Sequence, residues 1–148
     1  TVGIFLGTRA VAPSMEKSGG GSIVNLASMA AKQGSGSYGS AYSFSRGGMH
    51  NFTMSSALQL SQLGIRVNTI MPGWVHTPFT DYLYSDPEQS KYRTDRVPLR
   101  RWGKPDDIAG GILFLASEDA SYMTGAELLM DGGVSAGSVR PANPKASE

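Results

Sequence analysis

Ser28, Tyr42 and Arg46 bring a hydroxyl, a phenol and a guanidinium into one short stretch of the sequence. Tyr42 and Arg46 are four positions apart, and on a helix this spacing places both side chains on one face about a turn apart. A fixed positive charge close to a phenol favours the phenolate, so the tyrosine can exchange a proton near neutral pH. The spacing therefore predicts acid/base chemistry at Tyr42.

A strand predicted at 22–27 and a helix predicted at 42–63 position these side chains. The strand sequence is short and mostly apolar, which is typical of a parallel strand buried on both faces. The helix ends at Gly64, a residue suited to a left-handed C-cap. Its apolar stripe consists of Met49, Phe52, Ser56, Leu60 and Leu63. The opposite face holds Ser55, Ala57 and Ser61, and so little charge predicts burial both on a sheet and on another subunit.

The remaining periodicities predict a helix ending near Lys17, a strand at 65–70, a helix opened by Pro105-Asp106-Asp107 and a strand at 126–130. Right-handed crossovers would join these elements into an α/β fold. We expect the second half of a doubly wound Rossmann-type sheet, with about three parallel strands flanked by helices. Residues 1–133 would form this unit, and residues 134–148 a flexible tail.

Residues 74–101 have no clean periodicity but are rich in aromatic rings. Because the turn at Pro72-Gly73 ends a parallel strand, this segment would lie where ligands bind in open sheets. It predicts a mobile lid over the site, and the alternative is a surface loop that its rings merely anchor.

A glycine pattern at 34–39, Gly-x-Gly-x-x-Gly, matches the dinucleotide-binding fingerprint. A true fingerprint directly follows its strand and precedes an acid by about 20 residues, whereas no Asp or Glu occurs between Glu16 and Asp81. The pattern is therefore interpreted as a flexible approach to the helix of Tyr42. Tyr38 is a rival phenol, but no basic residue follows it four positions later.

The sequence resembles the short-chain dehydrogenase/reductase family over nearly all of residues 1–133. The resemblance rests on motifs in family order at 21–28 (GSIVNLAS), 42–46 (YSFSR), 64–68 (GIRVN), 72–77 (PGWVHT), 103–109 (GKPDDIA) and 122–133 (YMTGAELLMDGG). It implies hydride transfer between NAD or NADP and a secondary alcohol or its ketone. The family's asparagine would immediately precede Thr1 and its cofactor loop would lie upstream, so we expect the C-terminal part of a longer enzyme, inactive as a fragment.

The resemblance also implies roles for individual residues. Tyr42 matches the family's acid/base, and Ser28 matches the residue that stabilises the substrate oxygen. Val75 and Thr77, after Pro72 and Gly73, match positions that hold the nicotinamide. The choice between NAD and NADP stays open, and so does the identity of the substrate. The aromatic segment suggests a cyclic or steroid-like alcohol. Sugars and acyl thioesters are also substrates of the family. A homotetramer or dimer is implied.

Arg46 departs from the family pattern, which has lysine at this position. A guanidinium keeps the positive charge and can still donate hydrogen bonds to the cofactor ribose. It is larger than the ammonium group of lysine, planar and effectively never deprotonated, whereas the family lysine also feeds a proton relay. We therefore keep two alternatives to a normal enzyme: a slowed or inactive protein that binds the cofactor without turnover, and a fragment that only self-associates.

The composition excludes several other functions. A formal net charge of +1 gives no reason to expect a nucleic-acid partner, and no apolar run approaches the roughly 20 residues of a membrane helix. The absence of cysteine excludes disulfides and thiolate chemistry and suits a cytoplasmic location. No metal site is expected, because neither His50 nor His76 has a histidine or carboxylate at ligand spacing. His50 is predicted to face solvent or another subunit.

Overall fold

The computed structural model describes residues 1–33 and 39–137 of the chain. At its centre lies a parallel sheet in the order β1-β2-β3. The strands are β1 (Gly21–Leu26), β2 (Ile65–Pro72) and β3 (Glu127–Met130). The predicted α/β architecture with three parallel strands is therefore confirmed.

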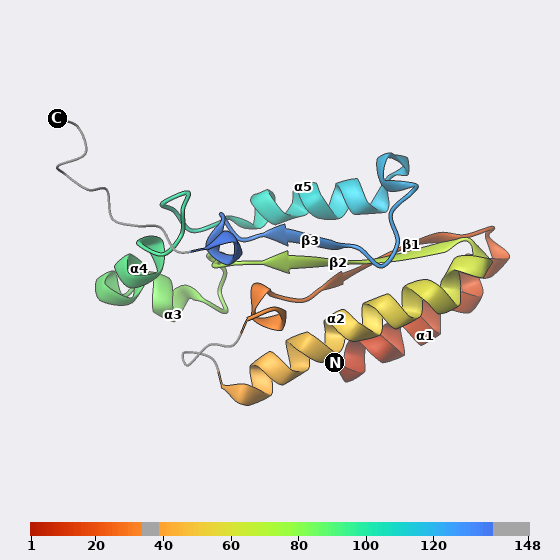
Figure 1. The fold of residues 1–148 in the computed structure, drawn as a ribbon, viewed down its shortest axis with the longest axis horizontal. Coiled ribbons are helices and arrows are strands. Elements are labelled where there is room, and N and C mark those ends of the chain that lie inside the picture. The colour runs from red at the N-terminus through yellow and green to blue at the C-terminus, as the bar shows by residue number, and fades with distance from the viewer. Residues whose placement is uncertain (34–38, 138–148) are drawn as a thin grey trace.

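Helices cover both faces of the sheet (Figure 1). On one face lie α1 (Val2–Lys17) and α2 (Ser40–Leu60), and on the other lies α5 (Pro105–Ala116). None of the described helices combines the length and the apolarity that crossing a membrane requires. Short 3-10 turns occur at Met29–Ala31, Ser61–Leu63, Glu118–Ala120 and Val134–Ala136. The last of these begins the predicted tail, of which residues 138–148 lie outside the described part of the chain.

The central strand β2 is sandwiched between the two helical layers. Val67, Ile70 and Met71 are fully buried. Because side chains alternate along a strand, Val67 packs toward Ala57 of α2, whereas Ile70 packs toward Leu115 of α5. Burial on both faces explains why apolar residues occur on both sides of this strand.

Helix α2 differs in detail from its prediction. It begins at Ser40 rather than Tyr42 and passes into the 3-10 turn 61–63, and Gly64 closes it with the expected left-handed backbone (φ 70°). Met49 and Ser56 of the predicted stripe are buried. The prediction that Ala57 lies on the opposite face is wrong, because its small side chain, 2% exposed, packs in the core against the sheet.

The segment 74–101 contains two helices that the periodicity did not reveal, α3 (Asp81–Tyr84) and α4 (Pro87–Thr94). They lie beyond the carboxyl ends of the strands (Figure 1). A helix of one turn and a short, mostly polar helix carry too little apolar pattern to detect. The start of α4 does follow a capping rule, since the Asp86 carboxylate accepts hydrogen bonds from two backbone N–H groups of its first turn.

Two polar side chains of β2 tie the segment between α5 and β3 to the sheet. Asn68 donates from Nδ2 to the carbonyl of Met123 (2.8 Å) and accepts from the N–H of Ala126 (3.0 Å). Arg66 donates to the carbonyls of Leu115 and Ser117, both at 3.0 Å. The Gly-Ile-Arg-Val-Asn motif therefore has a structural role, because it holds the loop that brings β3 beside β2.

The start of α5 is held by Asp107. Its carboxylate accepts two hydrogen bonds from the Arg101 guanidinium (2.7 and 3.0 Å) and one from the N–H of Lys104 (2.7 Å). These contacts, led by the Arg101 hydrogen bonds, lower the pKa of Asp107 from 3.8 to about 2.

Asp107→Asn is expected to lower the melting temperature by a few degrees at neutral pH. Because the folded pKa of Asp107 is depressed, its stabilisation is present above pH 3.8 and is lost as the pH falls through about 2. Thermal unfolding of the full-length protein at pH 7 and at pH 2 to 4 measures this. Asp106→Asn controls for the loss of a charge near the helix N-terminus. A difference in melting temperature between wild type and Asp107→Asn that persists unchanged at the lowest pH would contradict the prediction.

Candidate active site

A cleft of about 640 Å3 opens at the carboxyl ends of β1 and β2. Every residue that the sequence predicts for catalysis or cofactor binding lines this cleft: Ser28, Tyr42, Arg46, Pro72, Gly73, Val75 and Thr77. These residues come from the end of β1, the start of α2 and the end of β2 with its following loop. The parallel arrangement of the strands brings them together, because both strands end at the same edge of the sheet.

Ser28 sits just past β1, where the chain turns into the 3-10 turn 29–31. Its backbone is extended (φ −172°), and its Oγ accepts a hydrogen bond from the N–H of Ala30 (3.2 Å). A hydroxyl that accepts in this way still has its own proton to donate. Ser28 can therefore present a hydrogen-bond donor to a ligand in the cleft.

Tyr42 and Arg46 lie one turn apart on one face at the start of α2, as their spacing predicts. The guanidinium carbon of Arg46 is 4.6 Å from the centroid of the Tyr42 ring, so the cation stacks over the face of the phenol. One Arg46 nitrogen, Nη1, contacts the sulfur of Met49 at 3.3 Å. Its Nε is buried and has no hydrogen-bond partner among the described residues.

Gly73 has to be glycine at this place. A Cβ there would lie 2.7 Å from the Cα of Asp131, at the end of β3, so any larger residue would push the two strand ends apart. The Asp131 carboxylate accepts hydrogen bonds from the N–H groups of Gly133 (2.9 Å) and Ser135 (2.7 Å). Burial raises the pKa of Asp131, but these hydrogen bonds outweigh it and hold the pKa below its usual value.

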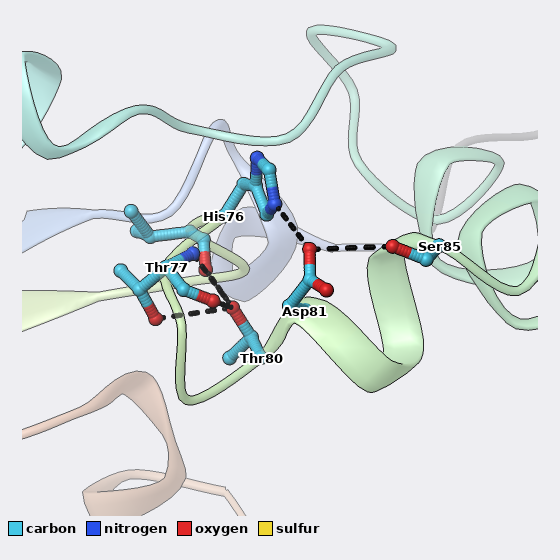
Figure 2. A network of polar contacts seen from close by, with 6 residues as sticks. His76, Thr77, Thr80, Asp81 and Ser85 are labelled. Atoms are coloured by element: carbon cyan, nitrogen blue, oxygen red, sulfur yellow. Dashed lines mark hydrogen bonds and ion pairs between the residues drawn. The ribbon is translucent and has the colours of Figure 1, made fainter.

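The loop after Gly73 is fixed by Thr80, a residue that the sequence analysis did not identify. Figure 2 shows its hydroxyl at the centre of the loop, where it donates to the carbonyl of Val75 (2.6 Å) and accepts from the N–H of Thr77 (2.9 Å). The Thr77 and Thr80 hydroxyls lie 3.2 Å apart. The Thr-x-x-Thr spacing was an available signal, since threonine hydroxyls often bond to backbone groups a few residues away.

His76 has a carboxylate partner, Asp81, which the search for metal-ligand spacing in the sequence did not find. Its Nε2 lies 2.9 Å from Oδ1 of Asp81, and the Ser85 hydroxyl donates to the same oxygen (3.2 Å; Figure 2). These hydrogen bonds, the one with His76 first, lower the pKa of Asp81. The His76 ring also stacks on Tyr84 with centroids 3.7 Å apart. These contacts join the loop after β2 to α3.

The structure contradicts the predicted exposure of His50 to solvent and leaves the alternative of another subunit a prediction. The Nε2 of His50 lies 2.7 Å from the Glu127 carboxylate at the start of β3, which also pairs with Lys32, and its side chain is only 18% exposed. His50 therefore faces the sheet rather than solvent, because β3 places an acid beside α2 that is far away in sequence. Within residues 1–33 and 39–137, no group of three His, Asp or Glu side chains could hold a metal ion.

The aromatic rings of the segment 74–101 divide into two groups. Trp74 and Tyr84 pack against Trp102, with centroids 5.6 and 5.4 Å away, and so anchor the segment. Phe79 and Tyr82 line the cleft and are more than 70% exposed. The segment therefore contributes both anchoring rings and cleft wall.

Arg93 of α4 also lines the cleft, and nothing in its sequence neighbourhood singled it out. Of the glycine pattern at 34–39, Gly39 lines the cleft as the residue before α2, whereas Gly34 and Gly36 lie outside the described residues, as does Tyr38.

Comparisons with known proteins identify close relatives. A family model described as enoyl-(acyl carrier protein) reductase matches residues 1–135. The L-rhamnose-1-dehydrogenase of Scheffersomyces stipitis is 41% identical over 133 residues, which cover 89% of this chain and 51% of that protein. The human dehydrogenase/reductase SDR family member 4 is 41% identical over 126 residues, covering 85% of this chain and 45% of that protein.

Solved structures share the fold as well. The crystal structure of a gluconate 5-dehydrogenase from Burkholderia cenocepacia J2315, in complex with NADP and tartrate, matches with a TM-score of 0.87 and 29% identity, over 91% of this chain and 52% of that one. The chain thus spans about half the length of the curated relatives it matches. The family model covers nearly the whole chain, and the predicted site residues line one cleft. The chain belongs to the short-chain dehydrogenase/reductase family.

Proposed function

We propose that the full-length protein is an NAD(P)-dependent oxidoreductase that interconverts a secondary alcohol and its ketone. The observation that carries this proposal is the convergence of Ser28, Tyr42, Arg46 and the loop 72–77 on one cleft at the carboxyl ends of parallel strands. The names of its relatives, which are dehydrogenases and reductases, support the same reaction class.

The roles proposed for the side chains follow from their chemistry. In reduction, the Tyr42 hydroxyl gives its proton to the carbonyl oxygen, and in oxidation the phenolate takes the proton of the substrate hydroxyl. Ser28 donates a hydrogen bond to the same oxygen and stabilises the negative charge that develops there. The apolar wall formed by Phe79 and Leu83 holds the carbon skeleton of the substrate and excludes water.

The residues present fit a nicotinamide cofactor, which when bound supplies or accepts the hydride. The buried Nε of Arg46, without a protein partner among the described residues, would meet a ribose hydroxyl. The loop bearing Val75 and Thr77 would hold the carboxamide. The NADP in the solved gluconate 5-dehydrogenase supports the cofactor class, which for this protein is NAD or NADP.

Arg46 favours a second candidate, a protein that binds the cofactor but turns over slowly or not at all. Its guanidinium lies over the face of the Tyr42 ring rather than pairing with an acid. An arginine side chain is effectively never deprotonated. Arg46 therefore cannot relay a proton to water.

Titration of the full-length protein with NADH and NADPH, followed by oxidation assays on a panel of secondary alcohols, tests both candidates. Arg46→Lys is expected to raise turnover severalfold by restoring a flexible ammonium beside the phenol. A lower or unchanged rate would contradict this role for Arg46. Saturable cofactor binding without oxidation of any alcohol by either form would favour the non-catalytic candidate.

We also propose that the full-length protein forms a homo-oligomer, a tetramer or a dimer, through the helical face of α1 and α2. Exposed apolar side chains there support this: Val2 (71%), Phe44 (83%) and Leu58 (79%). An exposed apolar face of this kind is typical of an interaction surface.

A further inference from the structure

Arg93 is a buried cation in the wall of the candidate active site. It belongs to α4, its side chain lines the same cleft as Ser28 and Tyr42, and the residue is only 7% exposed. Arginine is rarely buried to this extent unless a paired charge compensates for the lost hydration.

No such pair is present among residues 1–33 and 39–137. The Arg93 guanidinium stacks on the Trp74 ring at 4.6 Å, and its Nη1 donates to the backbone carbonyl and to Oε1 of Gln89 (2.9 and 2.8 Å). Both acceptors are neutral. The Nε of Arg93 is buried and makes no hydrogen bond to any described residue. The guanidinium is thus oriented by Trp74 and Gln89 while its charge stays uncompensated.

Three other arginines differ from Arg93 in their partners, their exposure or their place. Arg101 forms a two-fold contact with the Asp107 carboxylate. Arg66 donates to a set of backbone carbonyls after α5. Arg96, three residues beyond Arg93, is exposed to water and stacks on Tyr92. Arg93 thus lacks the acidic partner of Arg101 and the exposure of Arg96, and unlike Arg66 it lines the cleft of Ser28 and Tyr42.

The cleft as a whole has the charge of an anion-binding site. Its described lining contains two arginines, Arg46 and Arg93, and neither aspartate nor glutamate. In surroundings of low dielectric constant an unpaired guanidinium strongly attracts an oxyanion, and its planar fork matches a carboxylate.

We propose that Arg93 binds a carboxylate of the substrate, so that the alcohol oxidised in this cleft is a hydroxy acid and its product an oxo acid. The proposal rests on the oxidoreductase function proposed above and narrows its substrate class. A phosphate of the dinucleotide offers the same oxyanion chemistry, and the experiment separates the two sources.

The experiment compares matched anionic and neutral probes on the full-length protein: 4-oxopentanoate against its methyl ester, and D-gluconate against D-sorbitol. Dissociation constants are measured by calorimetry in the non-reacting combinations, the ketones with oxidised NAD or NADP and the alcohols with NADH or NADPH. Turnover is measured in the reacting combinations by the absorbance of the reduced cofactor. The wild type is expected to bind each anion at least about tenfold more tightly than its neutral partner. Arg93→Gln should reduce this preference about 10- to 100-fold, and Arg93→Lys should restore part of it.

Arg96→Gln is the matched control, because it removes an arginine that also stacks on a ring but does not line the cleft. The Arg96→Gln protein should prefer anionic probes as strongly as the wild type does. Equal binding of anionic and neutral probes by the wild type, or a preference that survives in a folded Arg93→Gln protein, would overturn the proposal. Weaker NADH or NADPH binding in Arg93→Gln with an unchanged probe preference would assign the residue to the cofactor phosphate and overturn it too. An anion preference that depends on Arg93, without turnover of any probe, would support the carboxylate site and count against the oxidoreductase function instead.

Discussion

Tyr42→Phe is expected to lower the turnover of the full-length protein about 100- to 10,000-fold, the usual contribution of general acid/base catalysis. The change removes one oxygen atom and its proton, and it leaves the ring on which the Arg46 guanidinium stacks at 4.6 Å. The helix start and the cleft wall should therefore stay in place while the proton donor is lost. Steady-state kinetics with saturating cofactor and alcohol measures the effect.

Two comparisons make this result specific. Tyr122→Phe removes the same hydroxyl from a tyrosine that is fully exposed on the loop after α5, and it should leave turnover within about twofold of wild type. The dissociation constant of NADH or NADPH should change less than about tenfold in Tyr42→Phe, because at most one hydrogen bond to the cofactor is lost. A Tyr42→Phe protein that retains more than a tenth of wild-type turnover would refute the acid/base role.

Asn68→Ala is expected to lower the free energy of unfolding by about 2 to 5 kcal/mol, which is a large part of the stability of an ordinary domain. Asn68 is completely buried in β2 and satisfies the carbonyl of Met123 and the N–H of Ala126. Alanine would leave both backbone groups without this partner and open a small cavity. Because the loop that they hold leads into β3, the strand that packs against Gly73, the cleft should also become less ordered.

Urea unfolding of the full-length protein measures the change. Asn51→Ala is the control, since Asn51 is exposed on α2 and its loss should alter stability by no more than about 0.5 kcal/mol. If Asn68→Ala costs less than about 1 kcal/mol, water or a neighbouring group replaces the amide and its structural role is refuted.

The order and type of the larger elements could be predicted from the sequence because each follows from a local pattern. The strand at Gly21–Leu26 and the helix at Pro105–Ala116 have apolar periods and end signals within their own residues. The convergence of Ser28 with Tyr42 and the loop 72–77 could also be foreseen, since ligands bind at the carboxyl ends of parallel strands. The family motifs added roles for these residues, which remain proposals.

Only the tertiary structure decided which side chains meet across long stretches of sequence. The pairing of His50 with Glu127, the burial of Ala57 against the sheet and the place of Arg93 in the cleft wall depend on how separate elements pack. The charges and spacings of residues within one helix or strand do not predict such contacts, because desolvation and charge pairing depend on the other elements that pack around a side chain. The sequence by itself thus determined the larger elements and the edge of the sheet where the site lies. The packing of α4 near that edge decided that a buried arginine lines the cleft.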